Sequence, residues 1–567
     1  FTYKGAMPTS GKLTLMKNTA NINLGTTYTG AKELPGSDTT EAFIDTNTSA
    51  PTATEILIKG YTFKGNALTP TTGSATEDVW AGRSVIGNTT TGNTLTVNGT
   101  THRDAYGGWT AGTGTSKAAK KDSTGNTVNL ISGTVRNIYG GFTSSTGGSA
   151  TGNKVNISGG TVGTGGTVYG GYISSATSAG GATGNSVTIT GGSMGDVYGG
   201  FTAGSGNTTG NTVNLGDGED SLAAGTTING NIYGGSGTDT TGNTLNVKTN
   251  AAAANIKNFE NLAFYVNSSA LNAAHPMLTL SSATNNLDWR KLTVDASKFD
   301  GTISTFEPYN LVLMQNAAGI SFMKGADDTY TLGGGVKSTT SGDFEFTIDT
   351  SSHTASATQV TEAGYKFKNH VASYSETTAH NEAWAGRTAA GNKVEKNKLT
   401  VTAGNITAAA YGGLVINNKP HATTGDAENN MIAVSGGNVQ AAYGAKLLTK
   451  GGSATKNTAV ITGGTVHDVY GASIAAVGAT GTVTKGIVNL SNAANVAGNV
   501  YGGHIADSAA TGTVTGSEVS LAGGIIGGTV YGGHNGGSGD AKDGKILLTG
   551  GSVKGEVYGG YAVGSGK

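Results

Sequence analysis

The word Tyr-Gly-Gly, or its variant Tyr-Gly-Ala, recurs along this chain and limits its fold more than any other feature of the sequence. Its tyrosines are Tyr106, Tyr139, Tyr169, Tyr198 and Tyr233 in the first half, and Tyr411, Tyr443, Tyr470, Tyr501, Tyr531 and Tyr558 in the second. Neighbouring copies within each half lie roughly 27 to 35 residues apart, a period typical of stacked-repeat proteins. A unit this short cannot bury its own apolar residues, so the copies are expected to stack.

A second word, Gly-Asn-x-apolar-x-apolar, precedes most tyrosines of the first half and begins at Gly92, Gly125, Gly152, Gly184, Gly210 and Gly242. The alternation in the third copy predicts a strand in which Val155 and Ile157 point inward and Asn156 points outward. A glycine-rich turn and a second short strand follow. In one repeat this second strand is expected from Met194 to Tyr198, ending at the two glycines of the first word.

These words predict an all-β chain that winds as a right-handed parallel β-helix, with its coils paired at the usual interstrand spacing of about 4.8 Å. Glycine accounts for 96 of the 567 residues, and the corners between the faces of a coil need the positive φ that glycine reaches at little cost. The asparagine at one fixed place in each coil predicts a ladder of stacked side-chain amides.

The charge of the chain limits its partners. Only 13% of the residues are charged and the formal net charge is −1, so there is no electrostatic basis for binding nucleic acid or an anionic membrane. The chain has no cysteine, and no apolar run reaches the ~18 residues of a membrane-spanning helix. We therefore expect no membrane insertion by this chain. Its first residues and its last coil read as parts of a longer polypeptide.

A duplication with an offset of 304 residues divides the chain into two tandem units. Gly60–Lys64 matches Gly364–Lys368, and Trp80–Arg83 matches Trp384–Arg387. We predict a first unit at 1–303 and a second, truncated unit at 304–567. Within them we expect entry segments at 1–78 and 304–380, Tyr-Gly coils at 79–248 and 381–567, and coils with fewer glycines, which continue the same stack, at 249–303.

The Gly-Asn-x-Val-x-Ile strands, the words of the type Gly-Gly-x-Val-x-x-Val-Tyr-Gly-Gly and the segment Asn258–Leu262 resemble the passenger regions of bacterial autotransporter proteins and related large β-helical surface adhesins. The likeness covers most of the chain. It implies a secreted protein of the bacterial cell surface, anchored at the outer membrane through a region outside this sequence. It also implies adhesion or biofilm-type aggregation through a glycan or protein of a host or bacterial surface, or through like molecules.

Two groups of side chains are candidates for a ligand-binding surface. If the valines of the second strand point inward, Tyr169, Tyr198, Tyr531 and Tyr558 point outward and form an aromatic column that packs sugar rings or a partner. The alternative, which we favour, is that the tyrosines cover the glycines and stack on each other. The second group pairs Trp80 with Arg83 and Trp384 with Arg387. Each pair is either a glycan platform or, as we favour, a cap at the start of a coil stack.

We predict no catalytic residue, no cofactor and no metal ion. The segment Gly234–Asp239 matches a calcium-binding repeat, but such repeats bind calcium in tandem and this one occurs once. Asp217, Glu219 and Asp220 form an acidic cluster that we interpret as a solvated loop. His504 and His534 follow Tyr-Gly-Gly at equivalent places, so they are expected to lie one above the other, as a solvated row in preference to a metal site.

Three functions fit these features. The first is a non-enzymatic surface adhesin or stalk, whose ligand contacts would lie in the variable loops at Lys117–Lys121 and Gly216–Gly225. The second is a self-assembling structural protein of an extracellular matrix or appendage. The third is a β-helical polysaccharide lyase or hydrolase, which would need carboxylates at equivalent positions of neighbouring coils. Acidic residues occupy such positions only one at a time, beside a tyrosine, as Asp196, Asp468 and Glu556 do.

Overall fold

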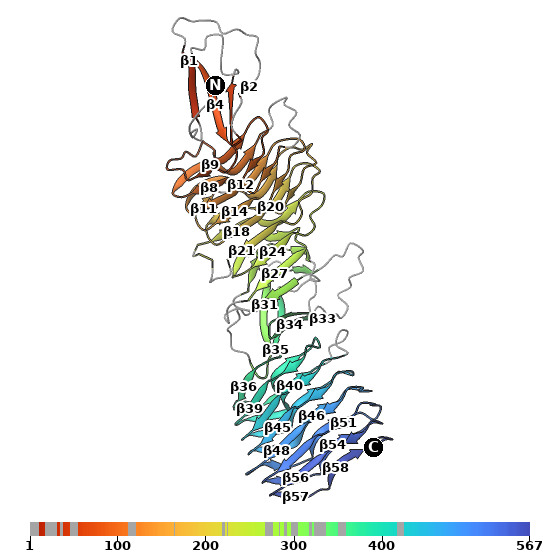
Figure 1. The fold of residues 1–567 in the computed structure, drawn as a ribbon. Helices are drawn as coiled ribbons and strands as arrows, with labels where there is room; N and C mark the ends of the chain where they lie inside the picture. The colour runs from red at the N-terminus through yellow and green to blue at the C-terminus, as the bar shows by residue number, and fades with distance from the viewer. Residues whose placement is uncertain are drawn as a thin grey trace.

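The computed structural model describes residues 11–17, 31–34, 38–45, 55–111, 121–163, 165–217, 222–223, 225–266, 276–282, 284–287, 292–295, 304–316, 320–322, 336–349, 359–416 and 424–567. Every regular element in this part of the chain is a β-strand, and none of it is a helix that could cross a membrane. The strands form an elongated β-solenoid whose coils stack along the long axis, with the N-terminal strands at one end (Figure 1). The predicted all-β solenoid is confirmed, and its right-handed sense stays a prediction.

Each coil contributes three strands to three parallel sheets. One coil consists of β10 (Ser123–Thr124), β11 (Thr127–Leu130) and β12 (Gly133–Thr143). We call the sheets that contain their counterparts the short, middle and tyrosine sheets. In all three, each strand pairs in register with the strand of the next coil, as Val128 does with Val155 and Tyr139 with Tyr169. The stack is therefore the same coil repeated.

In the first unit the sheets are assembled as follows. The short sheet contains β7 (Thr90–Thr91), β10, β13 (Ala150–Thr151) and β17 (Ala182–Thr183). The middle sheet contains β5 (Ala67–Leu68), β8 (Thr94–Val97), β11, β14 (Lys154–Ile157), β18 (Ser186–Ile189), β21 (Thr212–Leu215), β24 (Thr244–Val247), β27 (Asn261–Tyr265) and β30 (Leu292–Asp295). The tyrosine sheet contains β6 (Val79–Ser84), β9 (Thr100–Thr110), β12, β16 (Val168–Ile173), β20 (Val197–Thr202), β23 (Asn231–Ser236) and β26 (Asn255–Lys257), with β15 (Thr161–Val162), β19 (Ser193–Met194) and β22 (Thr227–Ile228) beside them.

The second unit repeats this arrangement. Its short sheet contains β38 (Val394–Glu395), β41 (Ala427–Glu428), β44 (Ala454–Thr455), β47 (Val483–Thr484), β51 (Val514–Thr515) and β55 (Ala541–Lys542). Its middle sheet contains β36 (Val371–Tyr374), β39 (Lys398–Val401), β42 (Met431–Val434), β45 (Thr458–Ile461), β48 (Ile487–Leu490), β52 (Glu518–Leu521) and β56 (Lys545–Leu548). Its tyrosine sheet contains β37 (His380–Thr388), β40 (Asn405–Val415), β43 (Asn438–Leu447), β46 (Thr465–Ile474), β50 (Val500–Ile505), β54 (Val530–Asn535) and β58 (Val557–Ala562), with β49 (Asn495–Val496), β53 (Ile525–Ile526) and β57 (Ser552–Val553) beside them.

The entry segments differ from the expected parallel coils. Four strands of the first form an antiparallel sheet in the order β1 (Gly11–Lys17), β4 (Glu55–Thr62), β3 (Thr40–Asp45) and β2 (Ala31–Leu34). The second repeats the pattern with β31 (Tyr309–Asn316), β35 (Gln359–Lys366), β34 (Phe344–Asp349) and β33 (Val336–Ser341). The physical reason is visible at Gly342, whose φ of 55° makes a two-residue turn that reverses the chain between β33 and β34. Hairpins therefore interrupt the parallel stack at the start of each unit.

The coils with fewer glycines continue the stack, as expected. β27 and β30 extend the middle sheet in parallel, and β25 (Ala251–Ala253) pairs in parallel with β28 (Leu278–Leu280). β28 then pairs with one edge of β31, whose other edge carries β35. A further pair, β29 (Thr284–Leu287) and β32 (Ile320–Phe322), bridges the two regions. The last coils of the first unit therefore connect through β31 to the entry sheet of the second.

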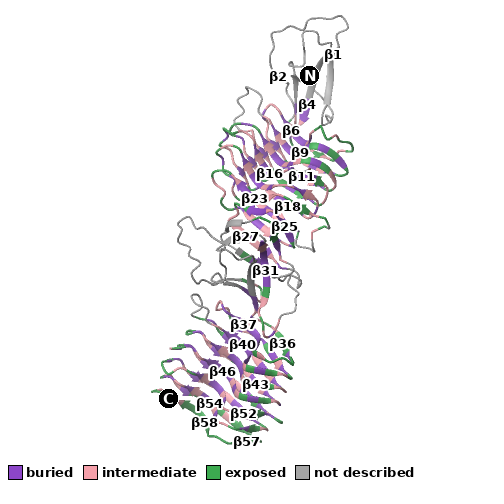
Figure 2. Ribbon diagram, turned by 180° about the vertical axis from the view of Figure 1, so that it is seen from behind, coloured by how far each residue is buried: buried purple, intermediate pink, exposed green. Residues whose placement is uncertain are grey.

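Alternation along the middle sheet builds the core. In β14, Val155 and Ile157 are buried and Asn156 is exposed, as predicted. The buried stripe continues along both stacks in Figure 2. The corner before each of these strands has positive φ, as at Gly152 with 64°. In the second unit one such corner is Gly516, and the others are Asn369, Lys396, Asn429, Lys456, Lys485 and Asp543, all of which keep the positive φ.

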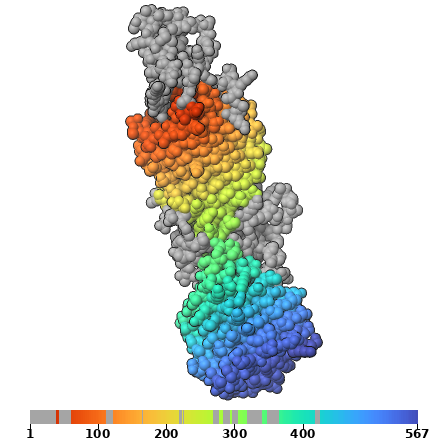
Figure 3. Space-filling view, in the orientation of Figure 1, coloured from red at the N-terminus to blue at the C-terminus, as the bar shows by residue number. Residues whose placement is uncertain are grey.

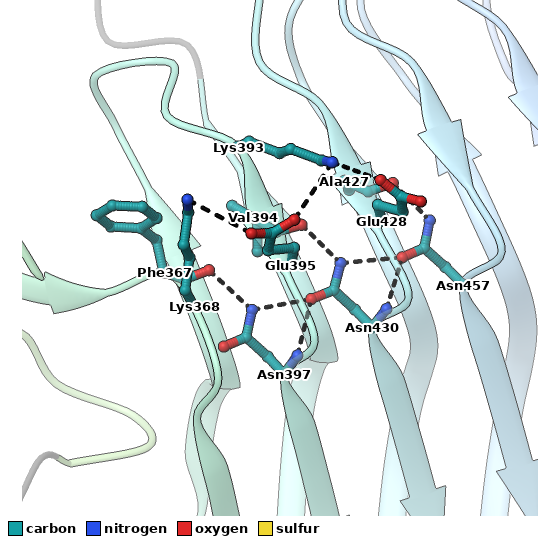
Figure 4. Close-up of polar contacts among 10 residues, drawn as sticks. All are labelled: Phe367, Lys368, Lys393, Val394, Glu395, Asn397, Ala427, Glu428, Asn430 and Asn457. Carbon is teal, nitrogen blue, oxygen red and sulfur yellow. Dashed lines mark hydrogen bonds and ion pairs between the residues drawn. The ribbon is translucent and has the colours of Figure 1, made fainter. Parts of the chain in front are cut away.

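The predicted asparagine ladder is confirmed. In the second unit, Asn397 Nδ2 donates to Asn430 Oδ1 at 2.8 Å, and Asn430 Nδ2 donates to Asn457 Oδ1 at 2.9 Å (Figure 4). The first unit has a longer ladder of buried residues: Asn93, Asn126, Asn153, Asn185, Asn211 and Asn243. Beyond Asn457 the register places Gly486, Ser517 and Gly544 at this position. Lys545, which follows Gly544, opens the strand β56 and lies outside the ladder.

The sequence predicted that the second strand ends at the glycines of Tyr-Gly-Gly, at a corner. This prediction is wrong, because these glycines lie inside strands. Gly140 and Gly141 belong to β12 and do not have positive φ. A Cβ on Gly140 would lie 2.4 Å from the carbonyl oxygen of Gly170 in the next coil, and a Cβ on Gly141 would lie 2.3 Å from Asn153 Nδ2. These positions therefore need glycine because neighbouring backbone and ladder amides approach closely.

A buried glutamate fixes each entry sheet to the first Tyr-Gly coil. Glu41 accepts hydrogen bonds from Ser84 Oγ at 2.7 Å, Val85 N at 2.6 Å and Asn88 Nδ2 at 3.0 Å. In the second unit, 304 residues later, Glu345 accepts from Thr388, Ala389, Ala390 and Asn392. Both side chains are almost fully buried. Burial raises the pKa of Glu41, although its hydrogen bonds oppose this shift.

Candidate binding surface

The tyrosines form a continuous stack on the outside of each tyrosine sheet. Tyr169 and Tyr198 lie 5.3 Å apart between ring centroids, and Tyr198 and Tyr233 lie 4.3 Å apart with nearly parallel rings. We call this stack the tyrosine column. It contains Trp80, Tyr106, Tyr139, Tyr169, Tyr198 and Tyr233 in the first unit, and Trp384, Tyr411, Tyr443, Tyr470, Tyr501, Tyr531 and Tyr558 in the second.

Stacking determines which part of each ring can meet a ligand. The rings of Tyr169, Tyr198, Tyr531 and Tyr558 point outward, as the alternation predicts, but stack on neighbouring rings and are half-buried. A sugar packs on the face of an aromatic ring, and the neighbouring coils occupy those faces. This arrangement is the ladder that we favoured over a sugar platform. Burial also raises the pKa of Tyr443 to about 12, so its hydroxyl stays protonated at neutral pH.

A second column, which the sequence analysis missed, runs beside the first. It lies three residues after each tyrosine, on the same side of the strand, and we call it the companion column. Its members in the first unit are Arg83, Trp109, Phe142, Tyr172, Phe201 and Ser236. In the second unit they are Arg387, Leu414, Lys446, Ser473, His504, His534 and Tyr561. The signal was the aromatic residue that follows Tyr-Gly-Gly in four consecutive first-unit repeats.

In the first unit the companion column is aromatic and packs against the tyrosine column. The rings of Tyr172 and Phe201 stack at 4.9 Å, and Phe201 meets Tyr198 edge to face at 5.4 Å. Such pairs stabilise by more than their buried area alone. The two columns therefore form one apolar aromatic strip on this face of the solenoid.

In the second unit the companion column carries titratable groups. His504 and His534 are in register on neighbouring coils, with ring centroids 5.2 Å apart, which confirms that they lie one above the other. They are half-buried instead of forming the solvated row that we expected. Burial lowers the pKa of His504 to about 3, and the nearby His534 and Lys446 lower it further. Ser473 Oγ lies 3.1 Å from His504 Nδ1.

The tryptophan–arginine pairs occupy the first rung of both columns. Trp80 is in register with Tyr106, and Arg83 with Trp109. The guanidinium carbon of Arg83 lies 4.4 Å from the Trp80 ring centroid, and that of Arg387 lies 4.4 Å from the Trp384 ring. Both pairs therefore cover the end of an aromatic stack, as expected of a cap, and binding of a glycan by either pair stays a prediction.

Carboxylates beside the tyrosines are engaged in contacts between coils. Asp196 Oδ1 accepts a hydrogen bond from Asn231 N at 2.7 Å, and Asp468 Oδ1 accepts one from Asn499 N at 2.7 Å. In the glycine-rich segment, Asp239 accepts a bond from Thr241 N of its own turn. Each of these carboxylates holds the backbone, so none is a free pair in a cleft.

Other predicted features lie partly outside the described residues. The residues outside the described ranges include Glu219, Asp220, most of the loop at 117–121 and part of the loop at 216–225. Within the described ranges, no three side chains of His, Asp or Glu are grouped so that they could hold a metal ion. Comparison of the chain with protein-family models, with curated proteins and with solved structures finds no match.

Proposed function

We propose that this chain is a non-enzymatic display rod, the extracellular passenger of an autotransporter-like protein at the bacterial cell surface. In this proposal it attaches to host cells, other bacteria or a matrix through a surface glycan or protein. The observation that carries the proposal is the repetition of one coil, with the same three strands and the same two outer columns in register. Such a rod holds its loops away from the surface to which it is anchored.

The chemistry of the described side chains supports binding over catalysis. A lyase or hydrolase of this fold would need carboxylates and cationic groups converging on a bound sugar. The carboxylates at the repeat position, such as Asp196 and Asp468, accept backbone hydrogen bonds from the next coil instead. A panel of polysaccharides incubated with the chain tests this alternative, because release of reducing ends or unsaturated products would favour an enzyme.

Adherence of cells tests the proposal directly. The chain would be displayed on a non-adherent bacterium as a fusion to an unrelated surface anchor, with an unrelated β-solenoid of similar length as the control. We expect displayed cells to aggregate or to bind host cells or matrix more than control cells do. Equal adherence by the two displayed proteins, together with no binding to a glycan array, would contradict the proposal.

A self-assembling structural protein is the second candidate, and one observation favours it. β31 pairs with β35 on one edge and with β28 of the preceding coils on the other. The last coils of one unit therefore join the entry sheet of the next by parallel strand pairing, and the same pairing between separate chains would build a filament. Electron microscopy of the purified chain distinguishes the candidates, since ordered filaments favour assembly and single rods favour display.

A further inference from the structure

Arg83 has an unusual environment at the first rung of the companion column. Its guanidinium carbon lies 4.8 Å from the ring centroid of Tyr61, 4.4 Å from that of Trp80 and 4.2 Å from that of Trp109. Contacts of this kind use the flat face of the guanidinium, whereas its five N–H donors point outward in the plane of the group. The rings therefore hold the cation in place without satisfying its hydrogen-bonding capacity.

The donors of Arg83 have no acceptor among the described residues. Its Nε is buried without a hydrogen-bond partner, and no ion pair joins Arg83 to a carboxylate in the described part of the chain. The two terminal nitrogens are not among the buried unpaired atoms, so they remain accessible at the rim of the cluster. Burial lowers the pKa of Arg83, which reflects the cost of holding this charge away from water.

A neighbouring carboxylate is diverted from Arg83 by a second arginine. Asp78 lies five residues before Arg83, and Arg103 on β9 donates to it through two atoms. Arg103 Nε lies 2.8 Å from Asp78 Oδ1, and Arg103 Nη2 lies 2.5 Å from Asp78 Oδ2. A two-point contact of this kind occupies both carboxylate oxygens. Among the described residues, Arg83 is therefore left as a cation without a counter-ion in contact.

The second unit provides an internal comparison. Arg387 packs on Tyr365 at 4.8 Å and on Trp384 at 4.4 Å, as Arg83 packs on their counterparts. The counterpart of Asp78 is Glu382, which lies 4.0 Å from Arg387 Nη1. At the 304-residue offset, Arg103 is replaced by Thr407, so no arginine draws Glu382 away. Arg387 keeps two of the three rings, because Leu414 stands where the first unit has Trp109. It has a carboxylate nearby, whereas no carboxylate of the described residues is in contact with Arg83.

The surface beside Arg83 is hollowed and rich in hydroxyl groups. A groove follows the loop at 69–78 and is lined by threonine and serine residues of that loop, by its carboxylates Glu77 and Asp78, and by Trp80, His102 and Arg103. Trp80 links the two features, because it borders the groove and also contacts the guanidinium of Arg83. Hydroxyl groups that both donate and accept hydrogen bonds suit a polyhydroxylated ligand.

We propose that Arg83 is the anion-binding residue of a saccharide site, and that the ligand is an acidic polysaccharide. A carboxylate or sulfate group of the ligand would accept charge-assisted hydrogen bonds from the edge of the guanidinium, while the adjoining sugar lies along the groove. The ligand would thus supply the counter-charge that no described residue of the first unit places in contact with Arg83. This inference deepens the proposed adhesive function and rests on it for the choice of a saccharide.

Binding of the whole chain to three immobilised polysaccharides tests the site. Polygalacturonate presents carboxylates, dextran sulfate presents sulfates, and dextran is the neutral control. We expect affinity for at least one acidic polymer and none for dextran. Arg83→Gln should weaken that affinity at least about tenfold, because a charged hydrogen-bonding partner is lost. Arg387→Gln is the matched control and should leave the affinity unchanged. Binding of one acidic polymer alone would identify its anionic group as the ligand.

A second variant tests the diversion of Asp78 without touching Arg83. Arg103→Gln releases Asp78, which would then compete for Arg83, so we expect weaker binding with Arg83 intact. Because Arg103 also lines the groove, the double variant Arg103→Gln/Asp78→Asn is the control: it removes the competing carboxylate and should restore the affinity, whereas an affinity that stays low would reject the diversion. Thermal unfolding of each variant establishes that the chain remains folded. Equal affinity of the wild type and Arg83→Gln, or equal binding to dextran, would overturn the site. If cells that display Arg83→Gln still adhere, the adhesive function is retained without the Arg83 site. If the purified chain binds acidic polymers but displayed cells do not adhere, the adhesive function is rejected and the Arg83 site is retained.

Discussion

The two tandem units share their inner construction and differ on one outer column. Both stack a tyrosine column over the glycines of β-strands, and both contain a ladder of buried asparagines. Their companion columns differ, since Tyr172 and Phe201 stand where the second unit has polar or titratable side chains such as Ser473 and His504. The comparison teaches that contacts between coils restrict the inner positions, while the outer column can change its chemistry without changing the coil.

The largest expected effect comes from breaking the asparagine ladder in its middle. Asn153 Oδ1 accepts from the backbone N and from Nδ2 of Asn126, and Asn153 Nδ2 donates to Ser123 O and Asn185 Oδ1, so Asn153→Ala removes four buried hydrogen bonds. We expect a loss of about 4 kcal/mol in the free energy of unfolding of the first unit. Asn457 ends the ladder of the second unit and makes three such bonds, with Asn430 N, Asn430 Nδ2 and Ala427 O, so Asn457→Ala should cost less, about 3 kcal/mol. Equal losses in thermal unfolding would contradict a ladder whose rungs support each other.

The second prediction uses the pH response of the histidine pair. The pKa of His504 is lowered in the folded chain to about 3, so the unfolded chain binds a proton more readily below pH 6.5. Stability should therefore be lost as the pH falls from 6.5 toward 3. We expect the second unit to lose about 2 kcal/mol between pH 7 and pH 5. His504→Phe, which copies the aromatic column of the first unit, should remove this loss. An unchanged acid response in that variant would reject the assignment.

The entry sheet of the first unit should respond to acid in the opposite direction. Burial raises the pKa of Glu41, so its contribution to stability is present below its unfolded pKa of 4.5 and is lost as the pH rises through the raised value. We expect amides of β3 and β4 to exchange more slowly with solvent at pH 5 than at pH 7, after correction for intrinsic exchange. Glu41→Gln should flatten this difference. Faster corrected exchange at pH 5 would have the wrong sign.

The smallest effect concerns the corner that precedes the middle sheet. Gly152 and Lys396 occupy it with φ of 64° and 56°. A lysine in this conformation is strained, so Lys396→Gly should stabilise the second unit by about 0.5 kcal/mol after the entropy cost of glycine. Gly152→Lys should destabilise the first unit by about 1 kcal/mol, because lysine is strained at this positive φ. No steric clash adds to this cost, because no atom lies within 4 Å of a Cβ at Gly152. Shifts of the same sign in both units would contradict this view of the corner.

Much of the coil could be predicted because its patterns are local. The period of the tyrosines predicts stacking, the alternation around Val155 predicts the buried face, and the repeated asparagine predicts the ladder. The companion column is recognised only by its position three residues after each tyrosine, and the types of residue in it differ between the two units. The hairpins of the entry sheets and the docking of Glu41 onto Ser84 join residues far apart in sequence, and no local pattern marks these contacts.

The positions of the glycines in Tyr-Gly-Gly could not be predicted for a different reason. A glycine at a corner and a glycine beneath a neighbouring coil look alike in sequence. The first needs positive φ, as Gly152 has, and the second needs the absence of a Cβ, as at Gly141 beside Asn153. Only the packing of the adjacent coil distinguishes them.

The central claim is that coils repeat in parallel and in register, and spin-label distances test it most directly. The chain has no native cysteine, so labels can be placed at Asn129→Cys and Asn246→Cys on outward positions of the middle sheet. Four coil steps separate these residues, and the account predicts backbone positions about 19 Å apart. Moving the second label to Asn214→Cys should shorten the separation by one step of about 4.8 Å. Distances that do not change by one coil step would contradict the account.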